Sequence, residues 1–150
     1  MNQLTPSGSL LLHKSSTCIV LITMAKSPDN KTILVVEDEA DMRFVLTERL
    51  RQEGFNVKEA TNGQEALDLL SHHPVDLILL DLVMPIMDGM EMLRRLQWDE
   101  EGKRTKVIIL TNSAEDTRMQ EALRRGIGNY VIKSDTTIEH IVGLVKDKLS

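Results

Sequence analysis

From Lys31 onward, the sequence alternates between short apolar runs and longer stretches in which apolar residues recur with helical spacing. The short runs are rich in Ile, Val and Leu and are bounded by Gly, Pro, Asn or Asp, a pattern that predicts β-strands. Three of them, ILVV, VDLILL and VIIL, are apolar almost throughout, as strands buried on both faces of a sheet are. The predicted strands are residues 32–36, 55–59, 75–80, 106–110 and 129–132.

Five stretches between and after these strands place their apolar side chains on one helical face. Gly54, Gly102 and Gly126 lie at or just past helix ends, where a left-handed residue is favoured. Thr136 and Glu139 resemble a capping box at the start of the last helix. The apolar positions that share a face are Met42, Val45, Leu46 and Leu50; Ala66, Leu69 and Leu70; Met90, Leu93 and Leu96; Met119, Ala122 and Leu123; and Ile138, Ile141, Val142, Val145 and Leu149.

Five strand–helix units in about 120 residues predict an α/β fold, with a parallel sheet covered by helices on both faces. The chain of 150 residues suffices for one domain, which we place at residues 31–150. Residues 1–30 differ in composition and contain no acidic residue before Asp29. We expect them to form a disordered or over-extended leader, with Met24 as a plausible true start; an ordered segment and a targeting peptide are the alternatives.

Acidic residues outnumber basic ones, 23 against 18, which gives a net charge of −5 at pH 7. The basic residues are scattered and aromatic residues make up 3% of the chain, so the composition argues against direct binding to nucleic acid or to an anionic membrane. The one cysteine excludes an internal disulfide and a Cys-x-x-Cys zinc site. We therefore expect a reducing, cytoplasmic location.

Polar side chains of types that can bind a metal or take part in a reaction follow four of the predicted strands. In an open parallel sheet, ligands bind at the carboxyl ends of the strands, so these side chains should converge. Carboxylates there can hold Mg²⁺ or attack phosphorus, while a lysine and a hydroxyl can neutralise and orient phosphoryl oxygens. The set comprises Glu37, Asp38 and Glu39 after the first strand, Asp81 after the third, Thr111, Asn112 and Ser113 after the fourth, and Lys133 after the fifth.

Each candidate also has an ordinary structural role available to it. Their common position at one edge of the sheet favours the functional interpretation, above all for Asp81, which ends an unbroken apolar run. The structural alternatives are a cap for Asp81, helix N-terminal acids for Glu37 and Asp38, a strand residue or cap for Thr111, a surface lysine for Lys133 and a core-edge aromatic for Tyr130.

Four stretches of the chain together resemble the receiver domain of two-component response regulators, over residues 31–149. They are ILVVEDE at 33–39, DLILLDLVMPIMDG at 76–89, VIILTNSA at 107–114 and NYVIK at 129–133. Their order, spacing and placement at successive strand ends make the match specific. The resemblance implies a flavodoxin-like fold with five parallel strands in the order 2-1-3-4-5, similar to single-domain chemotaxis regulators.

The resemblance also implies a role for four of the candidate residues. Asp81 matches the phosphoacceptor, Lys133 the conserved-type lysine, Thr111 the switch hydroxyl and Tyr130 the switch aromatic. Phosphorylation adds negative charge at Asp81, which is expected to draw Thr111 and Lys133 inward. In the family, this movement lets the switch aromatic turn inward and re-forms the face made by the fourth helix, the fifth strand and the fifth helix.

The cofactor and the partners are likewise implied by the resemblance. Mg²⁺ or Mn²⁺ is expected to be bound by Asp38, Asp81 and the backbone carbonyl of Val83, with Glu37 acting through water. The phosphoryl group is expected to come from a sensor histidine kinase, a histidine phosphotransfer protein or a small donor. We expect a stand-alone switch that is not an enzyme, which acts on an unknown downstream protein and can dimerise through the same face, without contacting nucleic acid or membrane.

Three positions depart from the family pattern. Ser134 follows Lys133 where the family commonly has a proline in a cis peptide, so we expect a trans bond and a differently shaped loop. Ile127 stands where alanine is usual and adds bulk near the fourth helix. Val83 is apolar and cannot orient an attacking water, which predicts slow self-dephosphorylation.

Two other classes of protein are alternatives. A pseudo-receiver would act as a constitutive interaction module, but the intact acidic, hydroxyl and lysine set argues against it. A haloacid-dehalogenase-type phosphatase requires a second aspartate two residues after the nucleophile, where Val83 stands. A P-loop nucleotide hydrolase is excluded by the lack of the Gly-rich phosphate-binding loop.

Overall fold

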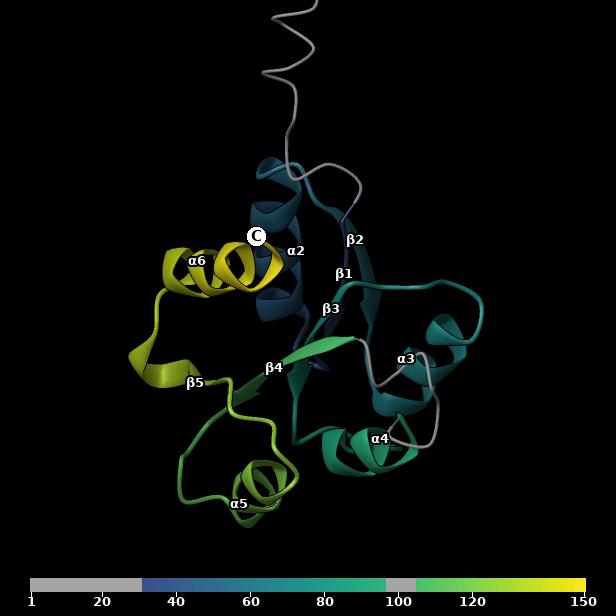
Figure 1. Cartoon of the computed structure of the whole chain (residues 1–150), viewed down its shortest axis with the longest axis vertical. Coiled ribbons are helices and arrows are strands. Elements are labelled where there is room, and N and C mark those ends of the chain that lie inside the picture. Colours follow the sequence, from purple (N-terminus) through teal and green to yellow (C-terminus); the bar gives the residue numbers. More distant parts are fainter. Residues whose placement is uncertain (1–30, 97–104) are drawn as a thin grey trace, which may run out of the picture.

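The computed structural model describes residues 31–96 and 105–150 (Figure 1). The predicted leader at residues 1–30 and the predicted helix end at Gly102 lie outside the described residues. The domain boundary near residue 31 therefore stays a prediction.

Five parallel strands form one sheet in the order β2-β1-β3-β4-β5, which confirms the predicted flavodoxin-like fold. A one-turn 3-10 helix, Lys133–Asp135, follows β5 directly. The strands are β1 (Thr32–Val36), β2 (Asn56–Ala60), β3 (Leu77–Asp81), β4 (Lys106–Thr111) and β5 (Tyr130–Ile132). The helices are α2 (Ala40–Gln52), α3 (Gly63–Leu70), α4 (Gly89–Leu96), α5 (Thr117–Arg124) and α6 (Ile138–Leu149).

The helices cover both faces of the sheet and so create two hydrophobic cores. Because successive side chains of a strand point to opposite faces, β1 gives Ile33 and Val35 to one core and Leu34 and Val36 to the other. The first core lies under α2 and α6, and the second lies under α3, α4 and α5 (Figure 1). Every residue of β3 is buried, as the continuous apolar run predicts for a central strand.

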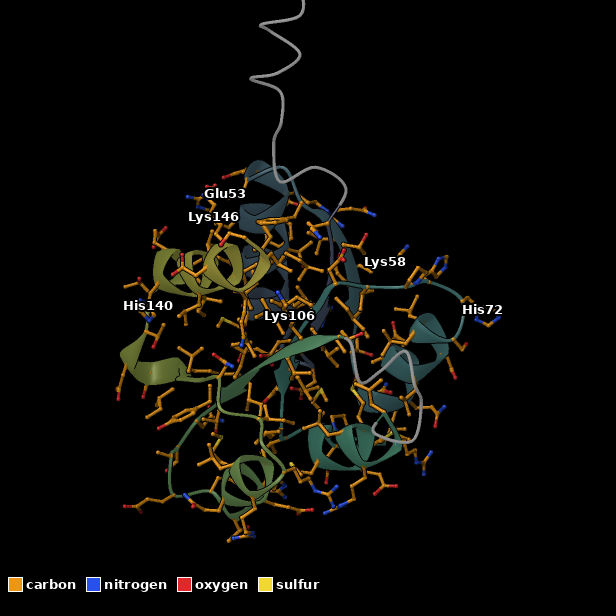
Figure 2. The ribbon with its side chains drawn as sticks, viewed as in Figure 1. Glu53, Lys58, His72, Lys106, His140 and Lys146 are labelled. Atoms are coloured by element: carbon orange, nitrogen blue, oxygen red, sulfur yellow. The ribbon has the colours of Figure 1, made fainter. Side chains whose placement is uncertain are left out.

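An ion-pair cluster joins the two helices of the first face. Glu53, just past the end of α2, pairs with Arg49 and with Lys146 of α6. Figure 2 shows Glu53 and Lys146 next to each other at this end of the molecule. The hydrogen bonds from Lys146 and then Arg49 hold the pKa of the Glu53 carboxyl below its ordinary value. The cluster therefore ties α2 to α6 far from the carboxyl ends of the strands.

The predicted apolar face of α2 is wrong at one position. Val45 is 45% exposed, whereas Leu46 and Leu50 are fully buried. The buried side of the helix turns instead toward Thr47, which is 1% exposed. The hydrophobic pattern favours Val45 over Thr47 because Thr47, although buried, is polar.

The start of α6 also differs from the prediction. Its N-cap is Thr137, whose hydroxyl accepts a hydrogen bond from the His140 amide at 3.2 Å. The predicted cap, Thr136, is the extended residue that ends the preceding 3-10 helix. The capping box is therefore wrong by one residue, because the 3-10 turn after β5 delays the start of the helix.

Other helix ends follow the prediction. Gly54 and Gly126 lie at the ends of α2 and α5 with φ of 94° and 88°, a conformation that glycine adopts without strain. All helices in the described ranges are too short or too polar to cross a bilayer.

Candidate functional site

Asp81 is the last residue of β3 and pairs in register with Leu110 of β4. It is 3% exposed, and its Oδ1 accepts a hydrogen bond from the Val83 amide at 3.2 Å. The chain then folds back onto the strand, because the Gly89 amide donates to the Leu82 carbonyl at 3.0 Å. A Cβ on Gly89 would lie 2.4 Å from the Asp81 carbonyl oxygen, so this close approach requires glycine.

The loop between β3 and α4 is anchored by two buried methionines and has an exposed apolar tip. Met84 and Met87 are buried, and the Met87 carbonyl accepts from the Gly63 amide at 2.9 Å. Ile86 lies between these two methionines in a γ-turn, which is closed by a hydrogen bond of 2.7 Å from the Met87 amide to the Pro85 carbonyl. Ile86 has a φ of 70° and is 84% exposed. The loop therefore holds the residues that follow Asp81 in one position.

Lys133 brings together the carboxylates of two different strands. Its Nζ lies 2.6 Å from Glu37 Oε2 and 3.3 Å from Asp81 Oδ2. The side chain is 13% exposed and projects from the first residue of the 3-10 helix after β5. The carboxyl ends of β1, β3 and β5 thus meet at one ammonium group, as the sequence predicted.

Glu37 is fully buried at the end of β1. Its Oε1 accepts from the Glu39 amide at 3.2 Å, and its carbonyl accepts from the Arg43 guanidinium at 2.9 Å. Burial, with a smaller contribution from the negative charge of Asp81, raises the pKa of Glu37 from 4.5 to about 7, although Lys133 opposes the shift. A buried carboxyl held in this way takes a proton readily unless a second cation is present.

The other two charged groups are shifted as well. Burial raises the pKa of Asp81, against the opposing effect of Lys133 and the Val83 amide. For Lys133, burial acts to lower the pKa, but the hydrogen bond to Glu37 and the charges of Asp81 and Glu37 outweigh it and raise the pKa. Lys133 therefore stays protonated and cannot neutralise both carboxylates alone.

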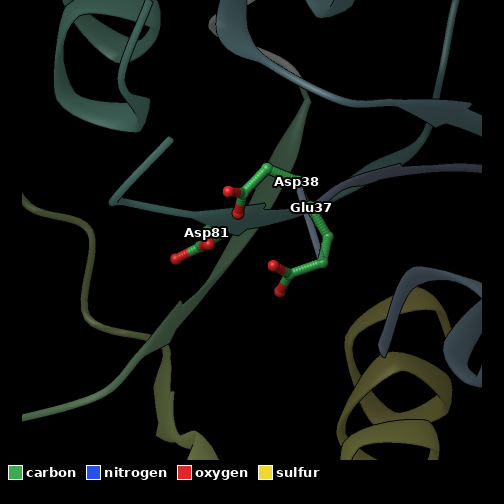
Figure 3. A group of neighbouring side chains, drawn as sticks. All are labelled: Glu37, Asp38 and Asp81. Carbon is green, nitrogen blue, oxygen red and sulfur yellow. The ribbon is translucent and has the colours of Figure 1, made fainter. Parts of the chain in front are cut away.

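Three carboxyl groups are arranged as a metal site would require. Glu37, Asp38 and Asp81 each offer an oxygen, and these oxygens lie within 4.8 Å of one another (Figure 3). Asp38 is exposed, whereas the other two are buried. Carboxylate oxygens are the ligands preferred by hard divalent cations, and among the described residues the three carboxyl groups face only one ammonium, that of Lys133, so such a cation would balance the remaining negative charge. The residues present thus fit Mg²⁺ or Mn²⁺.

Neither Thr111 nor Tyr130 is hydrogen-bonded to the carboxylates in the arrangement described. Thr111 is the last residue of β4 and is 2% exposed. Its hydroxyl donates to the Ser113 carbonyl at 3.0 Å and accepts from the Ser113 amide at 3.3 Å, so it is directed into its own loop. Tyr130 begins β5, pairs with Ile109 and is 39% exposed, so it does not fill the core edge.

The sequence model of the response regulator receiver domain matches residues 33–145. The chain belongs to the response regulator receiver family. The receiver is 40% identical over 101 residues to the transcriptional regulatory protein SrrA of Staphylococcus aureus strain NCTC 8325 / PS 47, a match that covers 67% of this chain and 41% of SrrA. The match thus spans about two fifths of that relative.

Solved receiver domains share the fold. A CheY-like response regulator receiver domain protein from Methanospirillum hungatei JF-1 is 27% identical with a TM-score of 0.72, covering 80% of this chain and 94% of that one. The signal receiver domain of a histidine kinase from Syntrophus aciditrophicus is 29% identical with a TM-score of 0.72, covering 79% and 89%. Receiver domains with this fold thus occur both in a response regulator and in a histidine kinase.

The peptide after Lys133 confirms one expected departure from the family. No peptide bond in the described ranges is cis, so the bond to Ser134 is trans. The chain enters the 3-10 helix at once, and the Ser134 hydroxyl donates to Asp135 Oδ1 at 3.0 Å. The loop carrying Lys133 is thus a compact turn.

Sequence reasoning missed two residues that shape the receiver's site. Arg43 of α2 donates to the carbonyls of Glu37 and Asp38, at 2.9 and 3.4 Å, and so fixes the β1–α2 loop. An arginine in a helix carries no signal for this role. Gly89 ends the stretch DLILLDLVMPIMDG, but its close approach to the Asp81 carbonyl depends on the tertiary structure, which the sequence pattern does not contain.

Proposed function

We propose that this receiver accepts a phosphoryl group on Asp81 from the phosphohistidine of a sensor kinase or phosphotransfer protein. The observation that carries the proposal is the position of Lys133 between Glu37 and Asp81, with Asp38 completing an acidic cluster. This arrangement supplies a nucleophile, a fixed positive charge and a set of metal ligands within one edge of the sheet.

The transfer step follows from the positions of these side chains. A carboxylate oxygen of Asp81 attacks phosphorus, the P–N bond of the phosphohistidine breaks, and its electron pair stays on the imidazole nitrogen. Lys133, 3.3 Å from Asp81, then neutralises negative charge on the transferred oxygens. Mg²⁺ or Mn²⁺ held by Asp38, Asp81 and the Val83 carbonyl, with Glu37 acting through water, would supply further charge neutralisation for those oxygens.

Thr111 and Tyr130 are proposed to convert this local charge into a surface change. The Thr111 hydroxyl would leave the Ser113 carbonyl and donate to the new phosphoryl group. Movement of the β4–α5 loop would then let Tyr130, now partly exposed, turn inward. The affected face comprises α5, β5 and α6, and the new phosphoryl group can shift the equilibrium only as far as it binds the active arrangement more strongly.

The output of the receiver is proposed to pass through a separate protein that binds this face. Receiver domains are signalling modules, and we propose that this one catalyses only its own phosphorylation and dephosphorylation. Its net charge of −5 opposes direct contact with nucleic acid. We further propose a cytoplasmic location and self-association through the same face.

Phosphorylation by acetyl phosphate with Mg²⁺, followed by intact mass, tests the proposal. The wild-type protein should gain one phosphoryl group, and chelation of the metal or Asp81→Asn should abolish the gain. Asp147→Asn is a matched control, because Asp147 is an exposed aspartate near the far end of α6. A gain retained in Asp81→Asn would contradict the assignment of Asp81, and no gain in wild type with either a small donor or a histidine kinase would favour a constitutive interaction module.

A further inference from the structure

A bidentate ion pair between Arg94 and Glu121 connects α4 with α5. Arg94 Nε donates to Glu121 Oε1 at 3.2 Å, and Arg94 Nη2 donates to Glu121 Oε2 at 2.8 Å. The planar guanidinium meets the carboxylate through two bonds at once, and both bonds can form together only over a limited range of helix positions. The pair thus specifies where α5 lies relative to α4.

Neighbouring charges hold both partners in this geometry. Arg94 Nη1 also donates to Glu91 Oε2 at 3.1 Å, one turn back on α4. Glu121 Oε1 also accepts from Arg125 Nε at 3.1 Å. These contacts restrict the rotamers of Arg94 and Glu121, which lowers the entropic cost of forming the pair.

The packing under α5 makes the pair more important there than a surface ion pair usually is. Five residues of α4 are buried, whereas α5, of the same length, buries only Met119 and Ala122. Little apolar area therefore fixes α5, and a side-chain bridge to the well-buried α4 supplies a larger share of the restraint.

The two joined helices also follow the two strands whose ends are proposed to react to phosphorylation. The chain reaches α4 from Asp81 and reaches α5 from Thr111. When the Thr111 hydroxyl leaves the Ser113 carbonyl, the loop that leads into α5 must move while Gly89 keeps the start of α4 against Asp81. The positions of α5 and α4 relative to each other would change, and the bidentate geometry would be lost.

We propose that the Arg94–Glu121 pair is a latch that holds α5 in the unphosphorylated position and so limits how readily the receiver switches. This inference rests on the proposed function, because it concerns the step that follows phosphorylation of Asp81. The side chains are 41% and 27% exposed, so breaking the pair should favour the switched state by about two- to fivefold.

The latch is tested by phosphorylation of Glu121→Gln with acetyl phosphate and Mg²⁺. The initial rate should rise about two- to fivefold over wild type, and the difference should shrink as NaCl is raised, because salt screens the pair in wild type. Arg94→Gln should behave in the same way. Glu48→Gln is the matched control, since Glu48 pairs with Arg51 at 3.0 Å within α2 and joins no second helix.

Amide exchange provides a readout that requires no phosphodonor. The amides of Ala122 and Leu123, in the last turn of α5, should exchange faster in Glu121→Gln, while those of the buried strand β3 should keep their protection. If Glu121→Gln is phosphorylated at the wild-type rate and its amide exchange is unchanged, the latch is contradicted, while the proposed function is not affected. If wild type gains no phosphoryl group while β3 remains protected, the proposed function fails, and the latch as a control of switching fails with it.

Discussion

Ile86 combines a strained backbone with an exposed apolar side chain. In the described part of the chain, it alone among non-glycine residues has a positive φ. A β-branched side chain in this conformation costs on the order of 1–3 kcal/mol. Because the side chain is 84% exposed, burial does not offset this cost.

We predict that Ile86→Gly stabilises the protein. Glycine adopts the φ of 70° without strain, and after subtraction of its larger entropy in the unfolded chain the gain should be about 1 kcal/mol. Urea unfolding measures the change. Val83→Gly is the control, since Val83 is an exposed β-branched residue of the same loop without a positive φ, and it should lose stability. Destabilisation by Ile86→Gly would show that the turn is not strained.

Elements as a whole were predicted well where hydrophobic periodicity determines them. The order and type of the strands follow from the continuous apolar runs, and the ends shifted by one or two residues where hydrogen bonds intervene. The apolar pattern, for example, predicts a strand that starts at Phe55, but the Phe55 amide donates to the Leu50 carbonyl at 3.2 Å and closes the end of α2, so β2 begins at Asn56. Such choices depend on three-dimensional contacts that a hydrophobic pattern does not contain.

The start of α6 gives a prediction at this scale. Thr137→Ala removes the hydroxyl that caps the His140 amide and should lower the free energy of unfolding by about 1 kcal/mol. Thr136→Ala, one residue earlier, should have little effect, because Thr136 is not the cap. Urea unfolding of both variants measures the two changes in the free energy of unfolding. A larger decrease for Thr136→Ala than for Thr137→Ala would show that Thr136 is the N-cap, as the sequence pattern predicts.

At the scale of the whole molecule, burial of carboxyl groups links stability to pH. The folded state raises the pKa of Glu37 from 4.5 to about 7, so it binds a proton more tightly than the unfolded chain does. The resulting stabilisation is present below the unfolded pKa and is lost as pH rises toward 7. Asp81, whose pKa is also raised, acts in the same direction from a lower pH. The raised pKa of Lys133 adds stability that persists throughout this range.

We therefore predict that the free energy of unfolding of the metal-free protein falls between about pH 5 and pH 7.5. The fall should be larger in wild type than in Glu37→Gln by on the order of 2 kcal/mol. Glu37→Gln keeps the shape of the side chain but cannot ionise. Mg²⁺ should restore more stability to wild type at the higher pH, because it binds the ionised carboxylates. Denaturant unfolding at several pH values measures the difference, and parallel pH profiles for the two proteins would contradict the shift.

The residues that meet at the candidate site could be predicted from the sequence, but their side-chain orientations and hydrogen-bond partners could not. Parallel topology places the ends of β1, β3 and β5 together, and the structure places Lys133 against Glu37 and Asp81, with an oxygen of Asp38 within 4.8 Å of an oxygen of each carboxyl. The direction of the Thr111 hydroxyl depends on a bond to the Ser113 carbonyl. The contact between Arg94 and Glu121 joins residues on two helices whose relative position the sequence does not specify.

The formation of an acyl phosphate on Asp81 is the central claim, and reductive trapping measures it most directly. The protein is treated with acetyl phosphate and Mg²⁺, reduced with borohydride, digested and sequenced by mass spectrometry. An acyl phosphate is reduced to the alcohol, so homoserine should appear at position 81 of wild type and be absent from Asp81→Asn. Homoserine at Asp38 or Asp88 instead, or phosphorylated protein with none at position 81, would contradict the account.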